Sequence, residues 1–232
     1  MENIFPHIGV VIVAGGSGTR MGGTLPKQFM LLGGQPVLAR TINNFAEALP
    51  GAEIVAVLPA GYIDFWHDYA RRFTVAEHRT AAGGRTRFHS VSCGLALLSD
   101  ACEAIAVQDG VRPLATPACI RRIATAALTQ GTAIPVIEAV DSYRSLSEDG
   151  TSRTVDRQSL RIVQTPQIFR ADLLRTAYAR PYDLAFTDDA TVVEAAGNTV
   201  HLVEGDPANL KITARIDLTV AESILAHRRD EK

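Results

Sequence analysis

The sequence is poor in the features that mark secreted and membrane-spanning proteins. Its 232 residues include three cysteines, Cys93, Cys102 and Cys119, and no two of them have the spacing of a zinc knuckle or a redox motif. This small, odd number excludes a disulfide framework and favours a reducing, cytoplasmic compartment. No segment approaches the ~20 apolar residues that a membrane helix needs, and the first residues carry no signal-peptide pattern.

Net charge is also nearly absent. A formal charge of −2 offers no broad basic face, so we expect no nucleic-acid partner and no attachment to a membrane surface. The six histidines show no metal-ligand spacing, and no serine–histidine pair suggests a catalytic nucleophile. By contrast, 47% of the residues are hydrophobic, which is enough for a sizeable core. We therefore expect one domain over residues 1–232.

The most informative stretch follows the first apolar run. Val10–Val13 is β-branched throughout, which predicts a strand buried on both faces. A glycine-rich loop comes next, and its backbone N–H groups can surround a phosphate. Two cations, Arg20 and Lys27, would lie on either side of that anion. The pattern predicts a phosphate-binding loop, with a glycine-rich turn bearing surface charges as the alternative.

Known phosphate motifs narrow this hypothesis. A P-loop requires Gly-Lys-Ser/Thr, whereas Pro26 precedes Lys27 here. The dinucleotide fingerprint requires a third glycine where Met21 stands, which disfavours a dehydrogenase. What remains is a longer loop that wraps a triphosphate. Its contacts are expected from Ala14, Gly15, Gly16, Gly18 and Thr19.

Two further segments carry candidate ligand-binding residues. In Gly83–Val91 two glycines precede a predicted helix, which places the Gly84 backbone and the Ser90 hydroxyl where they suit a base edge or a phosphate. A plain turn before a helix is the alternative. Asp109 and Gly110 follow the apolar run at 104–107, and ligands of open α/β sheets bind at the carboxyl ends of strands. Asp109 would hold a metal that bridges phosphates or would bind a ribose.

Strand and helix patterns alternate along the chain. They predict an α/β fold with a Rossmann-like, mostly parallel sheet and helices on both faces. Expected strands cover 52–58, 73–80, 132–137 and 199–203, and Pro135 indicates an edge or a bulge in the third of these. Expected helices cover 37–49, 62–72, 117–130, 169–178 and 216–228, with a short one from Thr187, its expected N-cap, to Gly197. Asp188 and Asp189 would favour that helix start, with metal binding as the alternative.

The composition changes between about residues 138 and 162. Two polar strands joined by a turn are expected there, and such a hairpin buries little of itself. We predict that this β-hairpin arm protrudes and packs on a partner subunit.

Together these segments resemble the 2-C-methyl-D-erythritol 4-phosphate cytidylyltransferases, a family of sugar-phosphate nucleotidyltransferases. The resemblance rests first on residues 14–22, followed by Pro26-Lys27-Gln28-Phe29, and it covers essentially the whole chain. Gly15 stands where the family more often has alanine, and Arg85 stands where it often has an acidic residue. The resemblance implies an enzyme that joins CTP and methylerythritol phosphate, releases pyrophosphate and works as a homodimer.

It also implies roles for particular residues. Gly84 and Ser90 would recognise cytosine, and Arg20 and Lys27 would stabilise the charge that builds on the α-phosphate. The arm would complete the neighbouring active site. The residues expected to contact the sugar phosphate are Arg112, Ser142, Arg157, Thr165 and Lys211, the last on a short strand beside the pocket.

The chemistry of this reaction fits what the sequence lacks. A phosphate monoester is already a charged nucleophile at neutral pH, so no general base is needed. Charge neutralisation and alignment are needed instead, and Mg²⁺ held by Asp109 would contribute to both. The alternatives are a cytidylyltransferase for another polyol phosphate such as ribitol 5-phosphate and, less favoured, a molybdopterin guanylyltransferase or a non-catalytic nucleotide-binding regulator.

Overall fold

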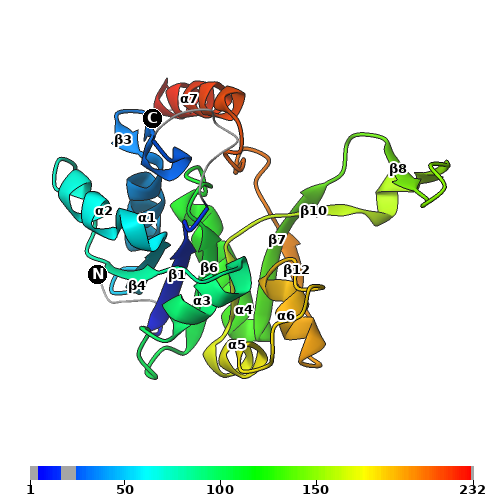
Figure 1. The fold of residues 1–232 in the computed structure, drawn as a ribbon, viewed down its shortest axis with the longest axis horizontal. Coiled ribbons are helices and arrows are strands. Elements are labelled where there is room, and N and C mark those ends of the chain that lie inside the picture. The colour runs from blue at the N-terminus through cyan, green and yellow to red at the C-terminus, as the bar shows by residue number, and fades with distance from the viewer. Residues whose placement is uncertain (1–4, 17–24, 231–232) are drawn as a thin grey trace.

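The structure, a computed structural model, describes residues 5–16 and 25–230. Its centre is an eight-stranded sheet in the order β10-β7-β11-β6-β1-β4-β5, with β12 paired to β7 (Figure 1). The strands of this sheet are β1 (Ile8–Val13), β4 (Glu53–Leu58), β5 (Arg79–Ala82), β6 (Ala104–Asp109), β7 (Thr132–Glu138), β10 (Arg161–Val163), β11 (Gln167–Arg170) and β12 (Leu202–Glu204).

The sheet is mostly parallel, as predicted. β1 pairs in parallel with β4 on one side and with β6 on the other, and β4 pairs in parallel with β5. Two strands run the other way, because β11 is antiparallel to β6 and β7, and β10 is antiparallel to β7. The carboxyl ends of β1, β4 and β6 therefore meet at one edge, and their amino ends meet at the opposite edge.

Helices cover both faces of the sheet, which confirms the predicted α/β class. Successive side chains of β1 alternate between two cores, Val10 and Ile12 on one face and Val11 on the other. The first core packs under α1 (Val37–Ala48), α2 (Ile63–Ala70) and α4 (Pro117–Gln130). The second packs under α3 (Arg87–Leu95), α5 (Ala171–Tyr178) and α6 (Asp189–Ala195).

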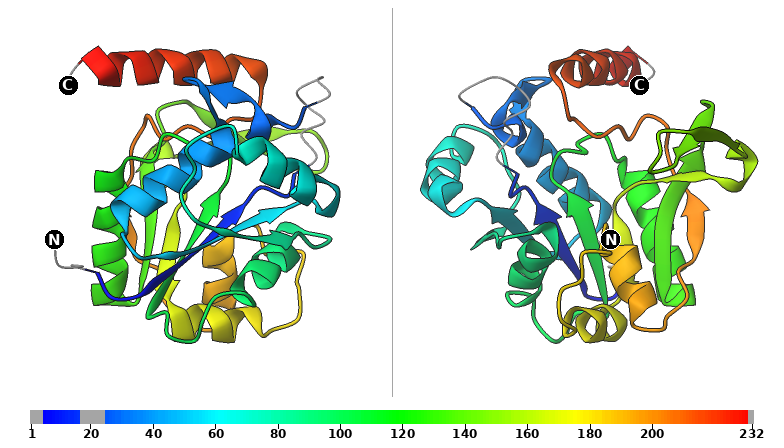
Figure 2. Two further views of the ribbon diagram at one scale, coloured as in Figure 1. Left: turned by 90° about the vertical axis from the view of Figure 1, so that its left-hand side faces the viewer. Right: turned by 45° about the vertical axis from the view of Figure 1, so that its right-hand side comes forward.

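The last helix, α7 (Arg215–Asp230), lies across one end of the molecule in every view (Figures 1 and 2). On its apolar stripe Ala221 is fully buried, and Leu218, Ile224 and Leu225 pack around it. These side chains meet Leu32, which belongs to a small ribbon of β2 (Leu31–Leu32) and β3 (Gln35–Pro36). The helix thereby closes a third, smaller core above the carboxyl edge.

The arm is a β-hairpin of β8 (Tyr143–Leu146) and β9 (Ser152–Val155), which form a separate two-stranded sheet. It projects away from the central sheet (Figure 1). A 3-10 turn, η4 (Arg157–Ser159), leads back from the arm to β10. The predicted hairpin is confirmed, and its contact with a partner subunit remains a prediction.

The described residues also include two short 3-10 turns, η2 (Lys27–Phe29) and η3 (Ala60–Tyr62). The predicted helix start at 117 and its stop at 131 are confirmed, since Thr116 caps the first turn and Gly131 adopts φ +85°. Pro135 does not lie in an edge strand, since β10 and β12 both pair with the adjacent Val136. The irregularity opposite Pro135 lies in the partner segment. Val163 pairs with Val136 and Ile168 with Ala133, so four residues of the β10–β11 segment face two residues of β7.

Several expected elements are wrong in position. The strand expected at 73–80 begins only at Arg79, because Thr74 and Ala76 hydrogen-bond to the Asn43 side chain of α1 and not to a neighbouring strand. The helix expected from Phe169 begins at Ala171, since Phe169 pairs with both β6 and β7. The strand expected at 199–203 is Leu202–Glu204. In the first two cases a tertiary contact outweighs the local pattern.

Candidate active site

A cavity of about 360 Å³ opens at the carboxyl edge of the sheet. It lies between the ends of β1 and β6, the start of α3 and the segment before α7. The residues that line it are Val13, Ala14, Gly15, Gly16, Lys27, Gln28, Gly84, Arg85, Thr86, Arg87, Ser90, Asp109, Val111 and Lys211. Segments far apart in the chain are therefore brought to one place by the strand order.

Eight residues that the sequence singled out line this cavity. They are Ala14, Gly15, Gly16, Lys27, Gly84, Ser90, Asp109 and Lys211. Gly18, Thr19 and Arg20, also expected here, lie outside the described residues. Lys211 reaches the cavity from a segment without strand structure, so the short strand expected around it is wrong. The neighbouring Ile212 N–H donates to the Val111 carbonyl at 2.9 Å, and this bond fixes the segment beside the cavity.

The floor of the cavity is held by close backbone contacts. The Ala14 N–H donates to the Val57 carbonyl at 2.8 Å, and the Gly110 N–H donates to the Val13 carbonyl at 2.8 Å. A Cβ on Gly110 would lie 2.8 Å from the Ala14 Cβ, so a larger residue cannot fit there without displacing the loop. Gly110 thus supports the cavity from beneath.

Gln28 is a residue whose role the sequence reading missed, although it belongs to the Pro26-Lys27-Gln28 motif. Its buried Nε2 donates to the Ala14 carbonyl at 2.9 Å and to the Gly16 carbonyl at 3.3 Å. Both carbonyls therefore face Gln28, and the backbone N–H groups of this loop are left to face the opposite side. The motif therefore couples the glycine loop to the turn that carries Lys27.

The start of α3 forms the opposite wall. The Gly84 N–H donates to Ser90 Oγ at 3.1 Å, and the Ser90 hydroxyl donates to the Thr86 carbonyl at 3.0 Å. A Cβ at Gly84 would lie 2.4 Å from the Cβ of His89, so this position requires glycine. Gly84 and Ser90 are adjacent, as the sequence predicted. Arg85 lines the same wall.

Asp109 is the electrostatic centre of the cavity. Its buried carboxylate lies 2.9 Å from Lys211 Nζ, 3.5 Å from Arg87 Nε and 3.6 Å from Arg112 Nε. Burial by itself would raise the pKa of Asp109, but the charges of Arg87, Lys211 and Arg112 outweigh it. The pKa of Asp109 therefore lies below its ordinary value, and the group stays ionised at neutral pH.

A buried network behind Asp109 holds it in place. Thr165 Oγ accepts the Asp109 N–H at 3.0 Å, and the Thr165 carbonyl accepts from the Asn209 side chain at 2.8 Å. Arg112 in turn donates to the Asn209 carbonyl at 2.7 Å. Burial lowers the pKa of Arg112, although the charge of Asp109 opposes this shift. Within this chain Thr165 and Arg112 thus position Asp109, and their contact with a sugar phosphate remains a prediction.

The family model for IspD, 2-C-methyl-D-erythritol 4-phosphate cytidylyltransferase, matches residues 8–227. The chain belongs to this cytidylyltransferase family. A curated relative of this name from Bacteroides fragilis is 46% identical over 217 residues, covering 93% of this chain and 98% of that protein. Another from Geobacillus kaustophilus is 35% identical, covering 95% of this chain and 98% of that protein.

Solved structures agree with this assignment. The crystal structure of 4-diphosphocytidyl-2C-methyl-D-erythritol synthase from Anaerococcus prevotii matches with a TM-score of 0.80 at 26% identity, covering 95% of this chain and 99% of that chain. The 2-C-methyl-D-erythritol 4-phosphate cytidylyltransferase from Thermus thermophilus matches with a TM-score of 0.75 at 32% identity, covering 94% of this chain and 98% of that chain. The cavity described above is therefore the candidate active site of a member of this cytidylyltransferase family.

Arg87 is the second side chain of the cytidylyltransferase site that the sequence reading missed. It donates twice to Asp189, from Nη1 at 2.9 Å and from Nη2 at 2.7 Å, while its Nε faces Asp109. Asp189 is 0% exposed and also accepts from the Tyr178 hydroxyl at 2.6 Å. Burial and the Asp189 charge raise the pKa of Tyr178 well above its ordinary value. The fully buried carboxylate thus orients a guanidinium that lines the cavity.

The two aspartates at the start of α6 have different roles. Asp188 is the N-cap and forms a capping box with Thr191, so the N-cap expected at Thr187 is wrong by one residue. Asp188 thus acts at the helix start, as expected, but as the N-cap itself and not within the first turn. Asp189 instead points inward to Arg87. Two adjacent aspartates at a helix start could have indicated two roles, because one carboxylate is enough to cap the helix and the second is then available for another partner.

The arm residues lie apart from this cavity. Ser142 and Arg157 are exposed, and Arg157 Nη1 donates to the Val140 carbonyl at 2.5 Å. Arg157 lines a second cavity at the root of the arm, beside Glu138 and Arg161. One chain by itself therefore does not bring Arg157 or Ser142 to the cavity at the carboxyl edge.

The cavity also determines how a metal ion would be held. Among its described lining residues Asp109 is the one carboxylate, and Mg²⁺ is usually held by one or two carboxylates together with substrate phosphates and water. The donor set fits such a metal.

Within residues 5–16 and 25–230, no helix has the length and apolar character to cross a bilayer.

Proposed function

We propose that this chain transfers the cytidylyl group of CTP to 2-C-methyl-D-erythritol 4-phosphate, giving 4-diphosphocytidyl-2-C-methyl-D-erythritol and pyrophosphate. The observation that carries this proposal is the Asp109 centre. An ionised, buried carboxylate with Lys211, Arg87 and Arg112 around it faces a glycine-walled cavity that also contains Lys27. Such a site neutralises and aligns phosphates, which is what attack of one anion on another requires.

The reaction is a displacement at phosphorus. A phosphate oxygen of methylerythritol phosphate forms a bond to the α-phosphorus of CTP, and the bond to the bridging oxygen breaks as pyrophosphate leaves. This nucleophile is already charged at neutral pH, so no proton must be removed from it. The described lining residues of the cavity include no histidine, in keeping with a mechanism that works by charge rather than by general base catalysis.

Each cation has a place in this scheme. Lys27, with Arg20 beyond the described residues, stabilises the charge that builds on the α-phosphate. Lys211 holds the incoming phosphate, and its ion pair with Asp109 at 2.9 Å already aims the ammonium group at the cavity. Gly84 and Ser90 bind the cytosine edge. We also propose that Asp109 binds Mg²⁺, which supplies positive charge to the triphosphate when bound.

We further propose a cytoplasmic homodimer in which the arm supplies Arg157 to the partner's cavity. Two apolar side chains support a contact at the arm, since Val140 is 71% exposed and Leu146 is 77% exposed. A hairpin of four-residue strands also has too little core of its own to be rigid without a neighbour. Small molecules, and neither nucleic acid nor membrane, are the expected ligands.

The test is a pyrophosphate-release assay with each nucleoside triphosphate against methylerythritol phosphate and ribitol 5-phosphate. Release is expected with CTP and methylerythritol phosphate. The variant Lys27→Ala should lose activity by roughly 10³-fold, as loss of a phosphoryl-transfer cation does. Arg71→Ala, at an exposed surface pair with Asp68, is the matched control and should keep full activity. Release with ribitol 5-phosphate in place of methylerythritol phosphate would overturn the substrate assignment.

The shared site has a separate test. Lys27→Ala and Arg157→Ala chains are each expected to be inactive alone, but a mixed dimer would contain one site with neither defect. Mixing the two inactive proteins is therefore expected to restore about a quarter of the wild-type activity if subunits exchange at random. Restoration must be measured after confirming subunit exchange with two different affinity tags. Failure of exchanged mixtures to regain activity would contradict an active site that spans two chains.

A further inference from the structure

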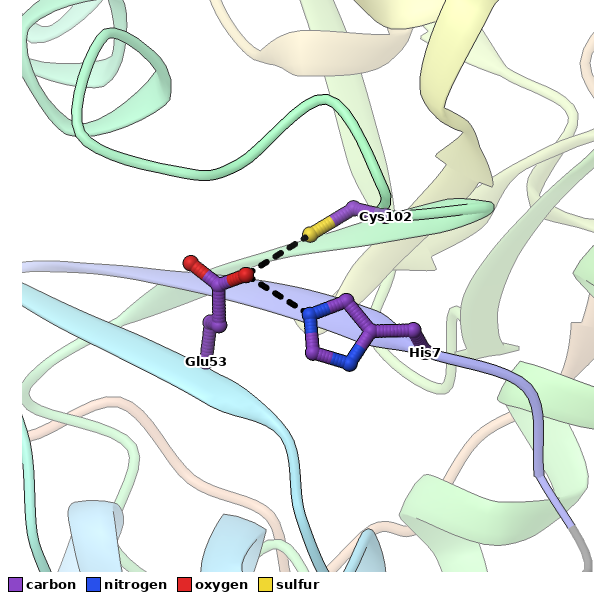
Figure 3. A group of neighbouring side chains, drawn as sticks. All are labelled: His7, Glu53 and Cys102. Atoms are coloured by element: carbon purple, nitrogen blue, oxygen red, sulfur yellow. Dashed lines mark hydrogen bonds and ion pairs between the residues drawn. The ribbon is translucent and has the colours of Figure 1, made fainter.

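Three side chains of types that can ligate a metal meet at the edge of the sheet opposite the nucleotide cavity (Figure 3). His7 immediately precedes β1, Glu53 is the first residue of β4, and Cys102 lies just ahead of β6. Because β1 lies between β4 and β6 and all three strands are parallel, their amino ends are adjacent. The topology therefore brings a nitrogen, an oxygen and a sulfur donor together.

Both of the other donors point at one oxygen of Glu53 (Figure 3). His7 Nε2 lies 2.6 Å from Glu53 Oε1, and Cys102 Sγ lies 3.9 Å from the same atom. Two ligands of a tetrahedral zinc ion would lie about 3.3 Å apart for nitrogen and oxygen and about 3.5 Å apart for sulfur and oxygen. The first distance would thus have to increase by about 0.7 Å and the second to decrease by about 0.4 Å, both within the reach of side-chain rotation.

The surroundings of the three donors suit entry of an ion from solvent. The His7 side chain is 39% exposed and that of Glu53 is 21% exposed, whereas Cys102 is buried behind them. Arg79 and the Ser99 N–H donate to the second carboxylate oxygen, Oε2, and the Ser99 hydroxyl donates to Oε1, which together fix the orientation of Glu53 as outer-shell partners do at metal sites. A water molecule can complete the coordination on the open side.

We propose that His7, Glu53 and Cys102 form a binding site for a borderline divalent metal ion, Zn²⁺ above all, separate from the nucleotide cavity. Imidazole, carboxylate and thiolate are the three ligand types that zinc takes in proteins, and this mixed set excludes Mg²⁺ and Ca²⁺, which prefer oxygen donors alone. A bound ion would join the amino ends of β1, β4 and the segment before β6. The proposal does not depend on the cytidylyltransferase reaction.

Proton balance sets the conditions for binding. The hydrogen bonds from His7 and Ser99, together with Arg79, lower the pKa of Glu53 to about 2, so this ligand is ionised throughout the neutral range. Burial raises the pKa of the Cys102 thiol, and Glu53 adds to this shift while Arg79 and Arg175 oppose it. Binding of Zn²⁺ therefore releases the thiol proton to solvent.

The test uses the full-length, tag-free protein and cobalt as a spectroscopic probe for zinc. Co²⁺ is expected to produce a near-ultraviolet sulfur-to-cobalt charge-transfer band, and equimolar Zn²⁺ should remove it. The band should be lost in Cys102→Ala and retained in Cys93→Ala, which serves as the matched cysteine control. Circular dichroism checks that both variants remain folded.

Calorimetric titration with Zn²⁺ supplies a second measurement. His7→Gln alters a half-exposed side chain and leaves the core intact, and we expect it to weaken Zn²⁺ affinity by at least ~10-fold. Absence of a charge-transfer band, or a band that disappears in Cys93→Ala and survives in Cys102→Ala, would overturn the proposal. Unchanged Zn²⁺ affinity in His7→Gln would do the same.

Discussion

The Arg87–Asp189 pair allows the sharpest prediction about the nucleotide cavity. Asp189→Asn keeps the shape of the side chain but removes the charge that faces Arg87. Loss of one partner from a buried ion pair typically costs about 3–5 kcal/mol. Asparagine retains one acceptor for Tyr178 or Arg87, and Arg87 keeps Asp109 at 3.5 Å. We therefore expect the lower end, a decrease of about 3 kcal/mol in the free energy of unfolding.

Urea denaturation measures this effect. With a slope near ~3 kcal/mol per molar urea, the midpoint should fall by about 1 M. Asp172→Asn is the matched control, because it removes an aspartate charge from an exposed pair with Arg170, and the expected change is below ~1 kcal/mol. The two variants thus separate loss of a buried partner from loss of a surface charge.

The same variant should affect binding of CTP. Without its buried partner, the Arg87 guanidinium is no longer held toward the cavity, and a loss of ~1.4 kcal/mol in nucleotide binding would raise KM for CTP about tenfold. Steady-state kinetics at saturating second substrate would show this rise, with kcat less affected. Wild-type stability together with wild-type KM in Asp189→Asn would refute the reasoning that Asp189 positions Arg87.

Three further predictions follow from other parts of the molecule. Gly94→Ala should lower the free energy of unfolding by about 1–3 kcal/mol, because the added Cβ would lie 2.5 Å from the Val11 side chain. Gly61→Ala is the control, since its Cβ would meet no atom within 4 Å, and the same urea titration should show almost no change. Glu53→Gln should make the free energy of unfolding depend less on pH between 4.5 and about 2. The pKa of Glu53 is lower in the folded than in the unfolded chain, so its ionised form stabilises the fold above pH 4.5, and this stabilisation is lost as the pH falls to about 2. An unchanged acid denaturation curve would contradict this role. Lys211→Met should raise KM for the sugar phosphate, measured in the pyrophosphate assay, and an unchanged KM would exclude the assigned contact.

Some of the fold follows from short-range patterns. The apolar runs at 10–13 and 104–107 form buried strands, and Thr116 and Gly131 begin and end α4 as their types predict. Such features depend on residues only a few positions apart, which the order of the sequence states directly. The failures lie where a distant partner intervenes, as at Phe169, whose strand needs β6 and β7 on either side.

The sequence by itself determined that a glycine-rich loop, an aspartate at the end of a strand and several cations belong to this protein, and it allowed the family resemblance to be recognised. Only the tertiary structure decided which cation faces which carboxylate. Lys211 meets Asp109, and Arg87 meets Asp189, because strand order and helix packing place distant segments side by side. The same parallel order brings His7 and Cys102 to Glu53 at the other edge. Pairing of this kind depends on the path of the chain in space, and no local spacing encodes it.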